Sequence, residues 1–277
     1  MPNSLQEHLT TSTIESINSK VKITSLKSNT IKDFKSILLI IPLGYTKERF
    51  FPLGCLWMEN GFQVYFVEIQ NNLGSNGNIY NSDILMQIED IMSVFQTLKC
   101  DIVLSWGILS IPVIKASDNL KQSFRHIFVS PEFDIKNFIE KIIDQKELIN
   151  LEKEIITDFT YLGYQISGSY IKSFIQSNLT NLQNIIDSTS SMNKWKIRII
   201  GYISEKNKDI FKKNGIEDVD YKIIPYATMN FDKNPKVAFQ MFETIVKESL
   251  QLVGIDNTDL KEILFKDIIK YKNNLNI

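Results

Sequence analysis

Asp101-Ile-Val-Leu-Ser-Trp-Gly-Ile-Leu-Ser110 is the stretch of sequence that decides the fold. Its apolar first half predicts a short buried strand over 101–106. Gly107 follows at once and is the residue best suited to a tight turn. The segment after the turn predicts a helix to about Asp118. The stretch therefore predicts a buried strand that runs directly through a sharp turn into a helix.

The same alternation of strand and helix continues on both sides of this stretch. Apolar runs predict further strands, and segments with helical spacing separate them: strands at 36–41, 62–69, 126–130, 196–203 and 221–225, and helices at 47–60, 82–98, 206–214 and 233–252. This alternation favours an α/β fold with a mainly parallel sheet and helices on both faces.

The ends of the chain add smaller elements. Residues 1 to about 12 are expected to form a loose arm, and 12–27 a hairpin with its turn near Asn18 and Ser19. A last amphipathic helix is expected to begin near Asn257.

Between Asp134 and Met192 the pattern becomes helical and polar, with no clear strand. We expect this segment to be a cap inserted between two strands of the sheet. The predicted organisation is a core formed by residues 1–133 and 193–277, with a helical cap over 134–192.

Composition narrows the class of protein. The formal net charge of the 277 residues is −1, and no basic stripe points to a nucleic-acid partner. The N-terminus has no apolar signal-peptide core, and the longest apolar run, 37–43, is too short to span a membrane. We therefore expect a cytoplasmic protein. Cys55 and Cys100 lie in apolar patterns, which favours buried free thiols over a disulfide or a metal site.

No motif for a cofactor or metal stands out. The loop at 71–77 contains glycine but lacks the spacing of a phosphate-binding or dinucleotide-binding loop. No group of His, Cys and Asp has the spacing of metal ligands. We expect no cofactor and no metal.

Several stretches, in the same order along the chain, resemble the myristoyl-acyl-carrier-protein thioesterase of bacterial bioluminescence operons and the acyltransferases of that family, which are α/β-hydrolases. The similar segments are Ile40-Ile-Pro-Leu-Gly-Tyr45, Leu56-Trp-Met-Glu-Asn-Gly-Phe-Gln-Val64, Glu68-Ile-Gln-Asn-Asn-Leu-Gly74, Asp134-Ile-Lys-Asn-Phe-Ile-Glu-Lys141, Tyr161-Leu-Gly-Tyr-Gln-Ile166 and 242–250. The resemblance covers most of residues 12–252. It implies an α/β-hydrolase fold with an inserted helical cap and activity on fatty acyl groups.

The catalytic positions of that family match poorly. The strand–turn–helix at 101–110 corresponds to the nucleophile elbow, G-x-S-x-G, and the resemblance places its serine at Ile108. It places the catalytic histidine at Met229 and the aspartate near Glu205 or Lys206. The triad is therefore degenerate at Ile108, Glu205 and Met229.

The backbone donors of the oxyanion hole do not depend on side-chain type. The resemblance places them at Gly44 and Tyr45, after the first parallel strand, and at Leu109, after the nucleophile position.

The backbone of the turn after the 101–106 strand leads to a further expectation. An elbow nucleophile sits in a strained conformation that suits glycine and not a β-branched residue. We therefore expect either a turn without a strained residue or a turn in which Gly107 takes the strained backbone conformation.

Few other residues are candidates for the missing nucleophile or the missing base. Of the two histidines, His8 lies in the expected arm, and His126 opens a strand at the end of the sheet far from the expected site. A packed or surface role is the simpler interpretation of His126. Ser105 and Ser110 flank the turn and are the alternative nucleophiles, but no base accompanies either of them.

Three functions follow from these observations. The first is a non-catalytic relative that binds an acyl group, an acyl-carrier protein or a partner biosynthetic enzyme. The second is an active acyltransferase or thioesterase that uses Ser105 or Ser110. The third is a structural subunit whose pocket has filled in, with Ile108 packed against Met229. Four aromatic residues of the cap fit either an acyl pocket or ordinary packing: Tyr161, Tyr164, Tyr170 and Phe174.

Overall fold

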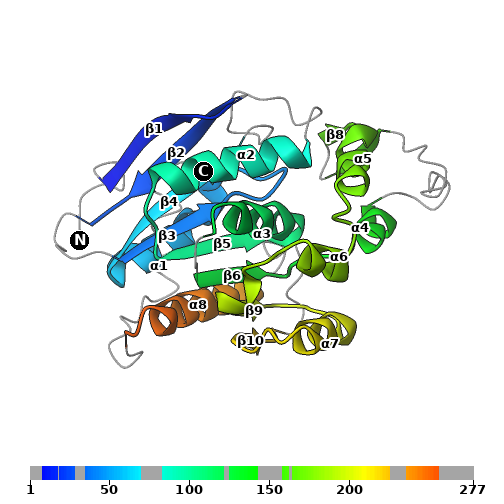
Figure 1. Ribbon diagram of the computed structural model, residues 1–277. Helices are drawn as coiled ribbons and strands as arrows, with labels where there is room; N and C mark the ends of the chain where they lie inside the picture. Colours follow the sequence, from blue (N-terminus) through cyan, green and yellow to red (C-terminus); the bar gives the residue numbers. More distant parts are fainter. Residues whose placement is uncertain are drawn as a thin grey trace.

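The computed structural model describes residues 8–17, 19–28, 35–69, 83–121, 125–142, 158–161, 164–224 and 235–255. An eight-stranded sheet forms the centre (Figure 1). Its spatial order is β1 (Leu9–Glu15), β2 (Lys20–Leu26), β4 (Phe62–Glu68), β3 (Lys35–Ile40), β5 (Ile102–Trp106), β6 (Arg125–Val129), β9 (Lys196–Ile200) and β10 (Val219–Lys222). β1 and β2 pair antiparallel, as do β2 and β4, and the remaining pairs are parallel.

Helices cover both faces of the sheet. On one face lie α2 (Ile84–Thr97), α3 (Ser110–Asn119) and α7 (Glu205–Lys213); on the other lie α1 (Phe51–Glu59) and α8 (Pro235–Leu252) (Figure 1). The short 3-10 helix η2 (Lys47–Phe50) leads into α1. The predicted α/β fold with a mainly parallel sheet is confirmed.

Local sequence explains these elements. Every residue of β5 is buried, because helices cover the strand on both sides, and this is why its sequence is apolar except for Ser105. The predicted start of α2 is confirmed at Asp83, whose carboxylate accepts hydrogen bonds from the backbone N–H groups of Leu85 and Met86.

The sheet begins earlier than predicted. The hairpin with its turn near Asn18 and Ser19 is confirmed, but its first strand starts at Leu9, within the segment expected to be a loose arm. The side chains of this stretch are mostly Thr and Ser, so they carry no apolar alternation. The strand is held by backbone pairing with β2, from Leu9 opposite Leu26 onward. The helix expected near Asn257 lies outside the described residues.

The segment between β6 and β9 is called here the cap segment (134–192). Its described elements are α4 (Ile135–Ile142), β7 (Phe159–Tyr161), β8 (Tyr164–Ile166), α5 (Gly168–Gln176) and α6 (Leu182–Asp187). The expectation of no strand here was wrong, because β7 and β8 form an antiparallel pair. Phe159 is opposite Ile166 and both are buried, but three residues are too few to show a strand pattern in sequence.

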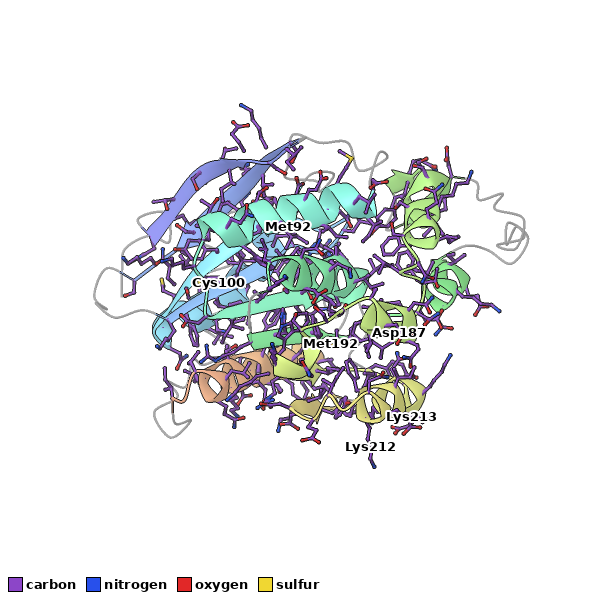
Figure 2. All side chains as sticks on the ribbon, viewed as in Figure 1. Met92, Cys100, Asp187, Met192, Lys212 and Lys213 are labelled. Atoms are coloured by element: carbon purple, nitrogen blue, oxygen red, sulfur yellow. The ribbon has the colours of Figure 1, made fainter. Side chains whose placement is uncertain are left out.

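The side chains fill the layers between the sheet and the helices (Figure 2). Both cysteines are free thiols, as predicted, with Cys55 buried and Cys100 partly buried. Burial raises the pKa of each thiol to about 12, so neither is a thiolate near neutral pH. No helix among the described residues is long and apolar enough to cross a membrane.

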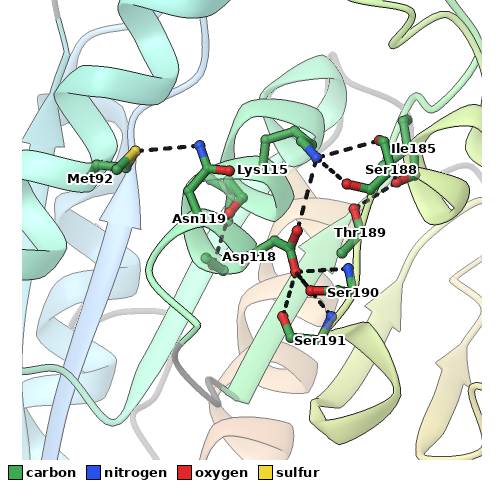
Figure 3. A network of polar contacts seen from close by, with 11 residues as sticks. Met92, Lys115, Asp118, Asn119, Ile185, Ser188, Thr189, Ser190 and Ser191 are labelled. Carbon is green, nitrogen blue, oxygen red and sulfur yellow. Dashed lines mark hydrogen bonds and ion pairs between the residues drawn. The ribbon is translucent and has the colours of Figure 1, made fainter.

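A carboxylate fixes the return of the cap segment to the core (Figure 3). Asp118, near the end of α3, accepts hydrogen bonds on one oxygen from the backbone N–H groups of Ser190 and Ser191, each at 2.9 Å. The two serine hydroxyl groups donate to the same oxygen at 3.2 and 2.8 Å. Lys115, one turn earlier, donates to the backbone carbonyl of Ser188. The end of α3 is therefore tied to the chain just before β9.

Replacing Asp118 tests this connection. The Asp118→Ala substitution leaves four donors without their charged acceptor, and hydrogen bonds to charged groups contribute about 1.5–3 kcal/mol. We expect the free energy of unfolding, measured by urea denaturation, to fall by about 2–3 kcal/mol. Ser190→Ala removes only one of the donors and serves as the control, with a loss of about 1 kcal/mol. Equal stability of Asp118→Ala and wild type would contradict this role.

Candidate functional site

The site is defined by the point where the order of the strands reverses. From β3 the chain proceeds to β4 on one side, and β5 then starts on the other side of β3. In open α/β sheets such a reversal leaves a crevice beyond the carboxyl ends of the two strands. The segments that enter this region are 41–46, after β3, and 107–110, after β5. Both predicted parts of the site therefore meet at one edge of the sheet.

The turn after β5 keeps the geometry of an elbow. Trp106 is extended, with φ −125° and ψ 135°, and Gly107 has φ 58°. Residues Gly107–Leu109 form the 3-10 helix η4, and α3 begins directly at Ser110. The expectation that Gly107 takes the special conformation is confirmed. Because an elbow nucleophile holds the strained position, the backbone places Gly107 at that point, one residue before the match suggested by sequence.

Ile108 is 1% exposed and belongs to the apolar core on the α2–α3 face. Its neighbour Leu109 is equally buried. Neither Gly107 nor Ile108 has a nucleophilic group, so the one-residue difference between the backbone and the sequence match changes nothing in the chemistry.

The alternative nucleophiles lie beside this turn. Ser105 is in β5 and Ser110 opens α3, as expected, and their side-chain oxygens are 3.2 Å apart in a hydrogen bond. Both residues are 0% exposed. The two hydroxyl groups satisfy each other under the turn, which is a packing solution for two buried polar groups.

Neither histidine lies at this edge. His8 Nδ1 donates to the backbone carbonyl of Lys27 at 2.9 Å, beside the β1–β2 hairpin. His126 is the second residue of β6 and pairs with Val103, the second residue of β5, which places it toward the amino ends of the strands. Its ring is fully buried, stacks on Phe128 and lies 4.7 Å from the Trp195 ring, measured between centroids. His126 is therefore a packed residue, one of the two roles expected for it.

One backbone donor predicted for the oxyanion hole has another partner. The Tyr45 N–H donates to the Pro42 carbonyl at 3.1 Å, and Gly44 has φ 78°, so residues 42–45 close a tight turn. Leu109 lies in η4, at the start of α3. In this structure the Tyr45 amide is engaged within its own turn.

Of the two remaining triad positions, the described residues include Glu205. Glu205 is the first residue of α7, its side chain is 82% exposed, and it forms an ion pair with Lys208 at 2.6 Å. Met229 lies outside the described residues, and so does any contact between it and Ile108.

The described aromatic residues of the cap segment pack tightly. Tyr170 and Phe174 are both 0% exposed and meet edge to face, with ring centroids 5.1 Å apart. The Tyr170 hydroxyl donates to the Gln87 side-chain oxygen on α2 at 3.4 Å. The Ser173 hydroxyl oxygen accepts from the Ile84 N–H at the start of α2. For these residues the packing interpretation fits the structure; the side chains of Tyr161 and Tyr164 lie outside the described set.

Two structural features near this edge of the sheet were not predicted from the sequence. Lys47, in η2, forms a 3.0 Å ion pair with Glu68, which is 0% exposed at the end of β4. Burial alone would lower the pKa of Lys47, but hydrogen bonds and the charges of Glu68 and Glu48 raise it. Ser130, directly after β6, has φ 42°. Sequence placed Ser130 at the end of a strand, before Pro131, and gave no sign of a left-handed backbone.

The described residues hold no group of three or more His, Cys, Asp or Glu side chains able to bind a metal ion.

Comparison with solved structures defines the fold class. The chain is similar to the esterase Est1E from Butyrivibrio proteoclasticus with bound ferulic acid, at 14% identity and a TM-score of 0.66, covering 87% of this chain and 99% of that one. It is similar to α/β-hydrolase domain-containing protein 10 from mouse, at 12% identity and a TM-score of 0.62, covering 88% and 99%. A thioesterase domain from the curacin biosynthetic pathway matches at 9% identity and a TM-score of 0.55, covering 86% and 98%.

These likenesses establish the α/β-hydrolase fold. No protein-family model matches the chain, and no curated protein matches it by sequence. The predicted fold class is thus confirmed, while the resemblance to the bioluminescence thioesterase remains a prediction.

The buried state of His126 predicts a pH dependence of stability. Burial lowers the pKa of His126 to about 3, whereas an unfolded histidine titrates near 6.5. Between these values the unfolded chain binds a proton that the folded chain does not, so stability falls as the pH drops below about 6.5. We expect wild type to lose about 1.4 kcal/mol per pH unit more than His126→Phe, which keeps an aromatic ring.

Urea denaturation of both proteins at pH 7, 6, 5 and 4.5 measures this difference. Equal losses of stability in wild type and His126→Phe over this range would show that the histidine is not held neutral by the fold.

Proposed function

We propose that this chain is a non-catalytic relative of acyl-carrier-protein thioesterases and acyltransferases, and that it binds an acyl group, an acyl-carrier protein or a partner enzyme of a cytoplasmic biosynthetic pathway. The observation that carries the proposal is the elbow: Gly107 takes the strained position and Ile108 is buried in the core. The turn has the shape of an α/β-hydrolase elbow without the group that attacks a carbonyl carbon.

The missing base supports the same conclusion. Serine hydrolysis needs a group that orients the hydroxyl and accepts its proton, usually a histidine. The chain has two histidines, one bonded to a backbone carbonyl beside the hairpin and one buried toward the other end of the sheet. Loss of one triad member leaves about 10³–10⁴-fold catalysis over water through the oxyanion hole and binding. With the Tyr45 N–H donating to Pro42, this contribution is reduced as well.

Acyl binding is supported by the architecture around the site and by the resemblance given above. The cap segment leaves the core at the carboxyl end of β6, two strands from β3 and next to the elbow strand. Est1E holds ferulic acid, a carboxylic acid, on the same fold, and the curacin domain is a thioesterase. A scaffold of this kind retains a place for an acyl group after the catalytic groups are lost.

The burial of Ser105 and Ser110 argues against a relocated nucleophile. We expect a fluorophosphonate probe to leave wild type, Ser105→Ala and Ser110→Ala equally unlabelled, because both hydroxyl groups are inaccessible and bonded to each other. We also expect no turnover of myristoyl thioesters above the uncatalysed rate. An active serine esterase labelled in parallel is the control. Labelling or turnover lost in either alanine variant would establish the enzyme instead.

Binding is tested separately from catalysis. Native mass spectrometry of the purified protein with myristate, and with myristoyl-acyl-carrier protein, should show a retained adduct of one or the other. If neither is retained, the scaffold is a structural subunit whose site is filled by its own side chains, and acyl binding is refuted.

A further inference from the structure

The strand β1 forms one edge of the central sheet, and the hairpin that it makes with β2 fixes which of its backbone groups face outward (Figure 1). At the turn of the hairpin, the Ser16 N–H donates to the Ser19 carbonyl at 2.8 Å. At its other end, the Lys27 N–H donates to the His8 carbonyl at 3.2 Å. In an antiparallel ladder, hydrogen-bonded pairs of this kind alternate with pairs that exchange no hydrogen bond.

This alternation turns the backbone of every second residue of β1 away from β2: Leu9, Thr11, Thr13 and Glu15. Their N–H and C=O groups are called here the β1 edge. Within the described residues, these groups have no hydrogen-bond partner. The pairing of β1 with β2 runs through the whole strand without a bulge, so the β1 edge is regular over its full length.

The opposite edge of the sheet is protected in ways that β1 is not. Natural sheets avoid association at their edges through short edge strands, charged side chains, bulges or proline. The edge strand β10 has four residues, and two of them, Asp220 and Lys222, form an ion pair at 3.1 Å. β1 has seven residues, most of them Thr or Ser, and its one charged residue is Glu15 at the end. The β1 edge is therefore able to accept another strand.

A second copy of this chain fits the β1 edge in an antiparallel register with a twofold axis at Ser12. In this register each outward-facing residue lies opposite an outward-facing residue of the other copy. Thr11 pairs with the partner's Thr13, and Leu9 pairs with the partner's Glu15. Every N–H and C=O group of the β1 edge then has a partner. Thr side chains directly opposite each other also form a favourable cross-strand pair.

The other side chains of β1 favour the same register. Ile14 packs partly against the core on the α2–α3 face and would lie opposite the partner's Thr10. Leu9 packs partly against the core on the other face and would lie against the aliphatic stem of the partner's Glu15. Glu15 already has a counter-ion in Lys20 of β2, at 3.1 Å. A parallel pairing in register would instead place the two Glu15 side chains together, and like charges directly opposite are destabilising.

We propose that the β1 edge binds a second copy of this chain, so that two antiparallel β1 strands join the two sheets into one continuous sheet. A contact made by one strand from each copy is expected to bury less than the roughly 1,200 Å² typical of stable complexes, which predicts a weak dimer whose population depends on concentration. The proposal is independent of acyl binding, because the β1 edge lies at the margin of the sheet and the elbow strand β5 near its centre.

The first experiment removes one donor from the β1 edge. Thr13→Pro deletes an outward N–H and leaves the hydrogen bonds to β2 in place, which is a position that an edge strand tolerates. We expect sedimentation equilibrium of wild type to show monomer and dimer, and the dissociation constant of Thr13→Pro to be about 10- to 30-fold higher, because the symmetry removes two hydrogen bonds. Thr13→Val keeps the N–H and the β-branched shape and should dimerise as wild type does. Circular dichroism of each variant verifies that it is folded.

The second experiment tests the register by charge. Thr11→Lys combined with Thr13→Lys, and Thr11→Glu combined with Thr13→Glu, each place like charges opposite each other in the dimer, so each double variant alone should be a monomer. A mixture of the two should form a heterodimer. Wild type that stays monomeric at every concentration overturns the proposal, as does a dimer that Thr13→Pro leaves unchanged. A mixture that fails to associate overturns the antiparallel register and the proposal with it.

Discussion

The pairing of β3 with β5 is the constraint on which the rest of the structure depends. Ile37 pairs with Ile102 and Leu39 with Leu104, and all four are fully buried. Burial of such side chains stabilises the fold by about 1.5–3 kcal/mol each, which fixes the register of the two strands. The chain then leaves β3 toward one side of the sheet and β5 toward the other. Their carboxyl ends are therefore left together, and the segments at 41–46 and 107–110 meet whatever side chains they carry.

On this backbone, the side chains at the elbow are buried and make packing contacts or hydrogen bonds with one another. A catalytic elbow must present a hydroxyl group to the site, beside a base. Here glycine takes the strained conformation, isoleucine is buried after it, and the serines on either side bond to each other. Each of these three arrangements avoids an unsatisfied polar group or a strained side chain, and each therefore favours the stability of the fold. The elbow of this protein is consistent with a turn kept for its fold.

Strain persists at the next strand instead. Ser130 keeps a conformation that glycine would hold more easily, and Gly201 is required to make room for it. The contrast is between Gly107, a glycine in the left-handed region at the elbow, and Ser130, a serine in the same region at the end of the next strand.

The sequence by itself determined the order of strands and helices outside the cap segment, the capped start of α2 at Asp83 and the glycine in the elbow, because each depends on local periodicity, a capping side chain or backbone sterics. It also determined that neither serine nor histidine stands at the positions that the resemblance matches to them, Ile108 and Met229. Only the tertiary structure decided that β1 begins at Leu9, that Lys47 pairs with Glu68, that the Tyr45 N–H is engaged by Pro42 and that Ser130 is strained. These features depend on backbone groups and on partners distant in the chain. Every residue except proline has a backbone N–H group, so the residue type does not reveal the partner of that group. The partner is determined only when the surrounding strands and turns are packed.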